Sequence, residues 1–169
     1  MMGLTYTAPL GFDIRHTYSI VISSLSERSP DYIPKEKRER PDGVHLLTAL
    51  DRIRTYPGVE SACLTDGGMP YYMGSRNLVW RIDTLQVPCR YAFVTPEFFD
   101  VFRIYDKDGK TASLKRAIED NNSIVISADV ETMNPGLSLL GQKAYRGNVT
   151  DEIEETIRGI SVPIRRHEY

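Results

Sequence analysis

Strict alternation of apolar and polar residues marks the clearest predicted strand, at residues 77–83 (NLVWRID), where the large apolar residues fall on one face. Its antiparallel neighbour is predicted at residues 87–94, with the connection at or near residues 86–88. Further apolar runs, each bounded by polar or turn-forming residues, predict strands at residues 17–23, 59–65, 123–127 and 154–164.

The strand predicted at residues 154–164 (EETIRGISVPI) has a period of two along its middle. Because Pro163 lacks a backbone N–H, the strand is expected to lie at a sheet edge or to end there. The alternation places Ile157, Gly159 and Ser161 on one face, and Ile160 and Val162 on the other.

A period of 3.6 residues predicts an amphipathic helix that begins at Asp42, whose side chain can cap it. Pro57 cannot continue the helix, and Gly58 makes the turn into the next strand. A strand, an amphipathic helix and a strand in this order form an αβ unit in which the helix covers one face of a sheet. The apolar stripe of this helix comprises Leu46, Leu47, Leu50 and Ile53.

The second half of the chain carries weaker helical signals. A short helix is predicted from Ser127 or Asp129 to Met133, where the following Asn-Pro-Gly ends it. Residues 111–122 are charged and tolerate a helix, and they are predicted to form either a short helix or an extended excursion.

The stretch YAFVTPEFFDVFRI (residues 91–104) is predicted to run from a half-buried strand directly into a helix. Thr95 can cap this helix, and Pro96 is well suited to its first position. The aromatic residues that recur at helical spacing and are predicted to pin the helix to a core are Phe98, Phe99 and Phe102.

Composition narrows the class of protein. The 169 residues are 41% hydrophobic and 26% charged, as in a soluble globular domain with one core or two small lobes. The net charge of −2 argues against nucleic acid as a partner, because phosphate binding needs a dense basic surface. No apolar run approaches the roughly 20 residues that span a bilayer, and residues 1–9 do not resemble a signal peptide.

The search for chemistry yields no catalytic, cofactor-binding or metal-ligating residue. Cys63 and Cys89 are expected to be buried thiols, with a disulfide as the alternative, and no histidine has a second at metal spacing. The turn at Asp106 and Asp108 lacks the ligands of a calcium loop. The glycine-rich loop at residues 66–75 lacks a phosphate-binding motif, and its candidate contacts for a partner or substrate are Met69, Tyr71, Tyr72 and Met73.

Several of these stretches together resemble the periplasmic core domain of ABC transporter permeases of the MacB/FtsX type. LDRIRTYPGVESACL (residues 50–64) is similar to the family's LxxLxxLPGVxxV, and VTPEFFDVFRI (residues 94–104) is similar to xVTPxYFxVFxI. SIVISADVETMN and the closing strand with its glycine also resemble family segments, in the same order. The fold-defining residues that the resemblance picks out are Pro57, Gly58, Thr95, Pro96, Phe98, Phe99 and Gly159.

The resemblance implies an α+β fold. It places a porter-like αβ lobe at about residues 12–66 plus 154–165, and an inserted, mostly β lobe at about residues 67–153. Residues 1–11 would be a linker from a preceding membrane helix. A domain taken from between membrane helices and an ordinary small soluble protein both fit the sequence itself.

The function implied by the resemblance is mechanical, in the periplasmic domain of a bacterial inner-membrane permease. Its partners would be a cytoplasmic ATPase, which binds the ATP, a second permease subunit, and an extracytoplasmic protein or exported substrate. The alternative from another class is a stand-alone extracytoplasmic domain that binds a small molecule or peptide. A third hypothesis is a small enzyme whose site assembles from scattered carboxylates.

Overall fold

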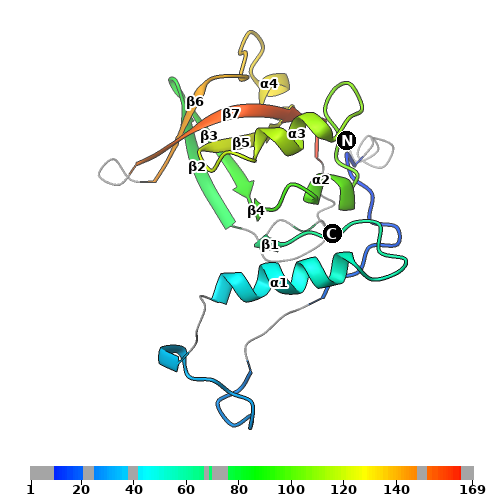
Figure 1. The fold of residues 1–169 in the computed structure, drawn as a ribbon. Helices are drawn as coiled ribbons and strands as arrows, with labels where there is room; N and C mark the ends of the chain where they lie inside the picture. Colours follow the sequence, from blue (N-terminus) through cyan, green and yellow to red (C-terminus); the bar gives the residue numbers. More distant parts are fainter. Residues whose placement is uncertain are drawn as a thin grey trace, which may run out of the picture. The chain divides into compact units, whose positions relative to one another are not determined.

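The computed structural model describes residues 10–20, 25–37, 42–66, 69, 76–147 and 152–164, with the side chains of 42–44 left out. The chain divides into two compact units, His16–Ala62 and the larger unit of Met1–Arg15 with Cys63–Tyr169. Figure 1 shows helices and strands combined in an α+β fold, which confirms the predicted class. Within the described residues, no helix combines the length and apolarity needed to cross a membrane.

The larger unit is built on a five-stranded sheet in the order β3-β2-β6-β7-β5. Its strands are β2 (Arg76–Ile82), β3 (Leu85–Tyr91), β5 (Ser123–Ser127), β6 (Lys143–Arg146) and β7 (Ile153–Ser161). The β5–β7 pair is parallel, and the other pairs are antiparallel. The strands predicted at residues 77–83 and 123–127 are therefore confirmed.

The hairpin between β2 and β3 turns at residues 83–84, where Asp83 adopts a left-handed φ of 53°. Aspartate tolerates this conformation better than most residues, so two residues suffice for the turn. The connection expected at or near residues 86–88 is wrong, because these residues pair with β2 inside β3.

The chain crosses to a second, two-stranded sheet immediately after β3. There β4 (Phe93–Val94) pairs with β1 (Thr65–Asp66). The strand predicted at residues 87–94 is thus broken at Ala92. The strand predicted at residues 59–65 is wrong for all but its last residue, because only Thr65 and Asp66 of this segment pair with another strand.

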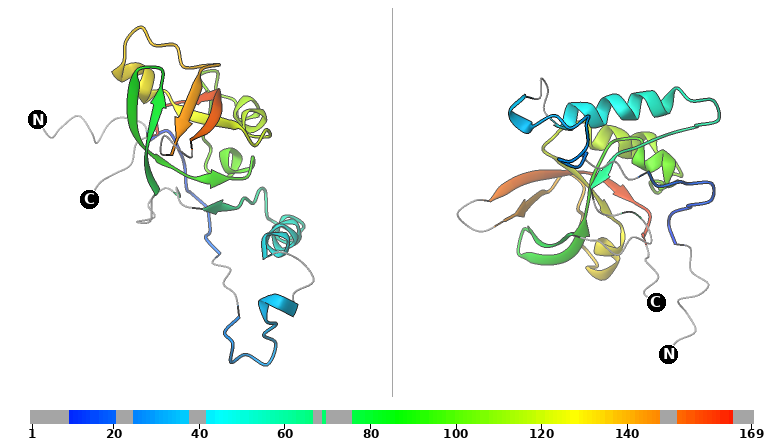
Figure 2. Two further views of the ribbon diagram at one scale, coloured as in Figure 1. Left: turned by 90° about the vertical axis from the view of Figure 1, so that its left-hand side faces the viewer. Right: turned by 90° about the horizontal axis from the view of Figure 1, so that it is seen from below.

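Helices lie on both faces of the five-stranded sheet (Figure 2), and each face has its own hydrophobic core. On one face, α4 (Asp129–Met133) contributes Val130 to a cluster with Trp80, Ile82, Val87, Leu139, Ala144 and Ile157. On the other face lie α2 (Phe98–Val101) and α3 (Ala112–Ala117), and we call the cluster there the phenylalanine cluster. Its buried members are Phe98, Phe99, Phe102, Ile104 and Leu114. Of the two alternatives for residues 111–122, the short helix is the one observed, and the helix predicted up to Met133 is confirmed.

A β-bulge in β7 changes which residues share a face. The pairing with β5 shifts so that Ile124 is opposite Ile157 and Val125 is opposite Gly159, leaving Arg158 as the extra residue. Ile157 and Ile160 consequently pack in the same cluster, whereas Gly159 faces α3. The common face predicted for Ile157 and Gly159 is wrong, because strict alternation takes no account of an inserted residue.

The smaller unit, His16–Ala62, contains the 3-10 helix η1 (Lys35–Lys37) and α1 (Asp42–Arg54). The helix predicted from Asp42 is confirmed, and Leu50 is its most buried residue, with only 2% of its surface exposed. Leu46 and Leu47 are exposed. The strand predicted at residues 17–23 is absent over 17–20, where no described segment pairs with the chain, and 21–23 lie outside the described residues.

Pro57 and Gly58 form the turn that follows α1. The Val59 N–H donates to the Tyr56 carbonyl oxygen (3.1 Å), and Gly58 has a φ of +87°. Proline followed by a left-handed glycine is the pattern of a type II turn. The Arg54 guanidinium then donates to the Ala62 carbonyl oxygen (3.2 Å), which holds the segment after the turn against the end of the helix.

The observed units differ from the lobes that the resemblance implies. The expected first lobe combined residues 12–66 with 154–165. In the structure, β7 is hydrogen-bonded to β5 and β6, both of which the resemblance assigned to the inserted lobe. The division into these two lobes stays a prediction.

Candidate functional site

The predicted contact loop connects β1 to β2. Tyr71, Tyr72 and Met73 lie outside the described residues. Met69 is half-buried and packs against the phenylalanine cluster. Its thioether side chain therefore anchors the start of the loop to the core.

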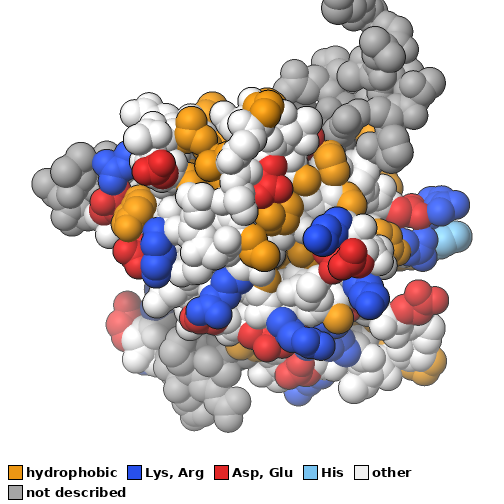
Figure 3. Space-filling model, turned by 90° about the horizontal axis from the view of Figure 1, so that it is seen from above, with side chains coloured by type: hydrophobic (Ala, Val, Ile, Leu, Met, Phe, Trp, Pro, Cys, Tyr) orange, Lys and Arg blue, Asp and Glu red, His pale blue; other side chains and the backbone are white. Residues whose placement is uncertain are grey.

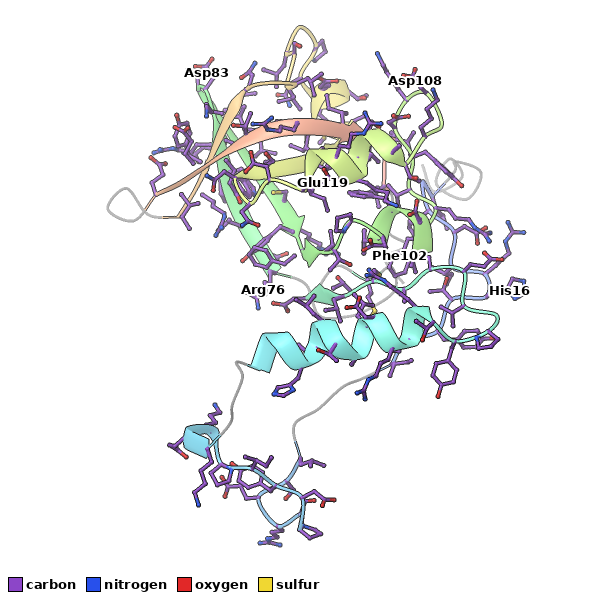
Figure 4. All side chains as sticks on the ribbon, in the orientation of Figure 1. His16, Arg76, Asp83, Phe102, Asp108 and Glu119 are labelled. Atoms are coloured by element: carbon purple, nitrogen blue, oxygen red, sulfur yellow. The ribbon has the colours of Figure 1, made fainter. Side chains whose placement is uncertain are left out.

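The base of this loop is closed by an ion pair. Arg76, at the start of β2 and labelled in Figure 4, donates from Nη2 to Oδ2 of Asp66 at the end of β1 (2.6 Å). Asp66 pairs with Phe93 across the small sheet. The two ends of the loop are thus held beside the aromatic ring of Phe93.

Phe93 is the centre of an exposed aromatic surface. Its side chain is 47% exposed, and the guanidinium carbons of Arg76 and Arg146 each lie 5.8 Å from the ring centroid. The Tyr91 ring meets it edge-on, with centroids 5.6 Å apart. We call Tyr91, Phe93, Arg76 and Arg146 the Phe93 surface. A cation–π contact at an exposed site contributes about 0.5–1 kcal/mol.

Arg146 is held in position by a buried carboxylate. Its Nε donates to Oε2 of Glu155 (3.0 Å), and only 7% of the Glu155 surface is exposed. Glu155 lies on the neighbouring strand β7, opposite Ala144. The ion pair with Glu155 therefore fixes the orientation of the Arg146 guanidinium that lies over the Phe93 ring.

Alternation along a single strand at residues 87–94 places Phe93 on the same face as Val87, Cys89 and Tyr91. The switch from β3 to β4 at Ala92 reverses this assignment and brings the ring to the surface. Arg146 is more than fifty residues away in the chain, so no local pattern links it to Phe93. The Phe93 surface can recognise a π system or an anionic group, and it contains no nucleophile.

Thr95 has a different role from the cap that the sequence predicts. The residue before α2 is Glu97, and no side chain caps the helix. The Thr95 Oγ1 instead accepts a hydrogen bond from the Leu64 N–H (3.1 Å), and the Thr95 N–H donates to the Leu64 carbonyl oxygen (3.0 Å). Pro96 lies in the turn before the helix, where its carbonyl oxygen accepts from the Phe99 N–H (3.4 Å).

Replacing Thr95 by valine is expected to lower the free energy of unfolding by about 1 kcal/mol, because the part-buried Leu64 N–H loses its acceptor. Urea denaturation followed by circular dichroism measures the change. Thr132→Val is a matched control, since the Thr132 hydroxyl is exposed on α4 and donates only to a helical carbonyl. Equal losses in the two variants would show that the Leu64 bond contributes nothing specific.

Four carboxylates of the larger unit have lowered pKa values. The Arg15 guanidinium holds the pKa of Asp13 well below its usual range, and a hydrogen bond from Ser113 lowers the pKa of Asp106. A hydrogen bond from Lys143 lowers the pKa of Glu154. Burial alone would raise the pKa of Asp100, but hydrogen bonds from Lys115 and Thr111 give a net lowering. These groups are ionised at neutral pH, whereas a general acid needs a raised pKa.

The lowered pKa of Asp100 leads us to expect that the free energy of unfolding depends on pH. Asp100 accepts from Lys115 Nζ (2.5 Å) and Thr111 Oγ1 (2.6 Å), bonds that fasten α3 to α2. Since its folded pKa is below the unfolded value of about 3.9, the stabilisation is present above that value and is lost as pH falls through the folded pKa. The urea midpoint of the wild type should fall between pH 5 and about pH 3 by more than that of Asp100→Asn. Parallel pH curves would contradict this.

The remaining candidates for chemistry have structural explanations. Cys63 and Cys89 are half-buried, not fully buried as expected, and they pack in different clusters. Burial raises the pKa of the Cys89 thiol to about 11. Asp106 accepts from the backbone N–H groups of Asp108 and Lys110 (both 2.9 Å), which shapes the turn that sequence analysis rejected as a calcium loop. In the part of the chain that the structure describes, no group of three or more His, Cys, Asp or Glu could hold a metal.

Charges of both signs are interspersed on the face of the molecule shown in Figure 3. Arg81 of β2 pairs with Glu152, and Lys143 of β6 pairs with Glu154 (2.7 Å). Arg158 of β7 pairs with Asp120 (3.3 Å). Such alternating ion pairs are typical of a solvated surface and contribute little to stability individually.

A likeness to known proteins exists at the level of structure. No family model matches the chain, and no curated protein matches it. A solved structure that resembles it is described as "a domain of a putative Permease protein from Porphyromonas gingivalis". The sequences are 22% identical, the TM-score is 0.48, and the match covers 64% of this chain and 42% of that one.

Proposed function

We propose that this chain is a non-catalytic extracytoplasmic domain of an ABC transporter permease of the MacB/FtsX type. It lies on the periplasmic side of a bacterial inner membrane and couples a cytoplasmic ATPase to export or to an extracytoplasmic partner. The observation that carries the proposal is that the stretches resembling the family, which are far apart in sequence, meet in the phenylalanine cluster.

The first two stretches meet at the beginning of this cluster. Residues 50–64 end at Leu64, whose backbone is bonded on both sides by Thr95 of the stretch 94–104. Cys63 packs directly against the cluster that Phe98 and its neighbours form. Thr95 therefore joins one resembling stretch to the other and leads into the helix that supplies the phenylalanines.

The other two stretches, which include β5 and β7, contact the same cluster from the face of the five-stranded sheet. Val125 of β5 packs against it, and a Cβ built at Gly159 of β7 would lie 2.9 Å from Val125 and 3.4 Å from Leu114. Each of the four stretches therefore contributes at least one residue to the packing around the phenylalanine cluster. Their convergence supports a shared fold as the origin of the resemblance.

The described residues also fit a mechanical or recognition role. Each carboxylate with a resolved pKa shift is held ionised by a structural partner, and the exposed aromatic surface is suited to contact. In the proposed assembly, ATP binds the partner ATPase, a second permease subunit completes the transporter, and the exported substrate or an extracytoplasmic protein contacts this domain.

Fractionation of the cells that produce the protein tests this proposal. An antibody against the chain should detect it in the inner-membrane fraction, and protease added to spheroplasts should digest it while leaving a cytoplasmic marker intact. Chemical cross-linking before solubilisation should recover a nucleotide-binding subunit with it. Recovery in the soluble cytoplasmic fraction, protected from the protease, would refute the proposal.

The Phe93 surface favours a second candidate, a stand-alone extracytoplasmic domain that binds a small molecule or peptide. In that case the chain fractionates as a soluble periplasmic protein. Acidic and aromatic peptides should raise its melting temperature, and Phe93→Ala should abolish the shift. Val79→Ala, at an exposed position on β2, is the matched control. A shift retained by Phe93→Ala would exclude this surface as the binding site.

A further inference from the structure

Three segments that are distant in sequence meet beside the end of α2. They are residues 10–13, residues 102–106 and residues 161–164. The Asp13 N–H donates to the Phe102 carbonyl oxygen (2.9 Å), and the Val162 N–H donates to the Tyr105 carbonyl oxygen (2.8 Å). The segment 102–106 is therefore hydrogen-bonded both to the early segment (residues 10–13) and to the late segment (residues 161–164). Phe102 is labelled in Figure 4.

The early and late segments also touch each other. Gly11 has a φ of +79°, and a Cβ built on it would overlap the carbonyl oxygen of Pro163. Only glycine permits so close an approach of two backbones together with a left-handed conformation. The contact leaves no room for either segment to move toward the other.

A side-chain ion pair reinforces the early segment. Arg103 Nη1 donates to Asp13 Oδ2 (2.9 Å), and Arg15 Nη2 binds the same oxygen (2.6 Å). Arg103 has a φ of 50°, in the left-handed region that a residue with a Cβ rarely adopts. Such a conformation persists only where its surroundings hold it. Here the Ile104 N–H donates to the Phe99 carbonyl oxygen (2.9 Å), which closes the end of α2 around Arg103.

The late segment also forms hydrogen bonds with the end of β5. The Ala128 N–H donates to the Ser161 carbonyl oxygen (3.0 Å), and the Ile164 N–H donates to Ser127 Oγ (3.2 Å). Asp106 forms an antiparallel bridge with Ser161. The late segment therefore lies between the end of α2 and the end of β5, with a bond to each.

The middle segment is a rigid support for both. Phe102 and Ile104 are buried members of the phenylalanine cluster, so the segment cannot shift without disturbing close-packed side chains. Phe12 of the early segment packs against the same cluster. The two outer segments thus share a support as well as a direct contact.

We propose that these three segments form one cooperative junction, which holds the early and late parts of the chain together and joins them to α2. Displacing either outer segment weakens the contacts of the other. It also weakens the contacts that both segments make with residues 102–106 at the end of α2. The junction deepens the proposed function, on which it rests for the source of the displacement: it is the place where movement of the adjoining membrane segments enters the domain.

Hydrogen exchange resolved at single amides by NMR tests the junction. Asp13→Asn keeps the size of the side chain but removes the charge that holds Arg103. Exchange of the amide of residue 13 should become about tenfold faster, and the amides of Val162 and Ile164 should accelerate with it. The Trp80 amide in β2 should keep its wild-type rate.

The reverse perturbation tests reciprocity, because coupling between two sites must act in both directions. Ser127→Ala removes the acceptor of the Ile164 N–H and should accelerate exchange of the Asp13 amide. Arg158→Gln is the control, since it breaks an exposed ion pair on β7 outside the junction and should change none of these rates.

Acceleration confined to the mutated segment in either variant would overturn the proposal, as would an equal acceleration at Trp80, which indicates global unfolding. These measurements use the chain in solution and do not depend on its location in the cell. A cytoplasmic location would refute the permease assignment while leaving the exchange result unchanged. The two failures are therefore distinguishable.

Discussion

Phe99→Ala is expected to lower the free energy of unfolding of the larger unit by about 3–5 kcal/mol. The Phe99 side chain is only 4% exposed, and its ring meets that of Phe98 edge-on with centroids 5.9 Å apart. Truncation removes the transfer free energy of the ring and leaves a cavity in a cluster where α2, α3 and the sheet meet. Urea denaturation at pH 7 gives the change.

Phe93→Ala is the matched control, because it removes the same kind of side chain six residues earlier in the same stretch, but from an exposed position. Its cost should stay below about 1.5 kcal/mol, the loss of edge contacts and cation–π attraction. If Phe99→Ala does not fold, Phe99→Leu keeps most of the volume and should cost about 1–1.5 kcal/mol. A loss of less than about 1 kcal/mol in Phe99→Ala would contradict its burial.

Gly159→Ala is expected to cost about 1–3 kcal/mol, through overpacking between β7 and α3. The added Cβ would lie 2.9 Å from Val125 Cγ2 and 3.0 Å from the Cβ of Ala117. The Val125 methyl group and the Ala117 Cβ are both close to the backbone, so neither can change rotamer to avoid the added Cβ. The clash can therefore be relieved only if α3 shifts away from the sheet. The free energy of unfolding, measured by urea denaturation, reports this cost.

A double-mutant cycle with Ala117→Gly separates the packing effect from other changes. Removing the Ala117 Cβ makes room for the new one, so the two substitutions together should cost less than the sum of their separate costs by about 1 kcal/mol. Gly58→Ala provides the contrast, because its left-handed φ is strained but no atom lies within 4 Å of the added Cβ. Additive costs for Gly159 and Ala117 would show that helix packing is not the reason for the glycine.

The local patterns predicted the elements that depend on local forces. Residues 77–83 and 123–127 alternate or are apolar in the manner of strands, and both are strands in the structure. The helix from Asp42 and its termination before Pro57 follow from periodicity and from backbone restrictions that act within a few residues. The phenylalanines of α2 were predicted to be core residues on the same grounds, and they are buried.

Pairing between distant segments decided the rest. Residues 17–23 satisfy the pattern of a strand, but residues 17–20 pair with no strand among the described residues. A single strand leaves its backbone hydrogen bonds unmade within the protein, so apolar composition is not sufficient. The candidate site shows the same dependence, because the Phe93 surface draws on β2, β3, β4 and β6.

The stretch 91–104 shows both kinds of determination. Its own residues predicted a strand that leads into an aromatic helix, because these elements follow from spacing and φ restrictions within the stretch. The tertiary structure decided that Phe93 is exposed and that Thr95 binds Leu64. It also decided that the residues after the helix form hydrogen bonds with two segments distant in sequence, residues 10–13 and 161–164. Each of these depends on the register of a partner strand or on a backbone contact across more than thirty residues, for which a local pattern contains no information.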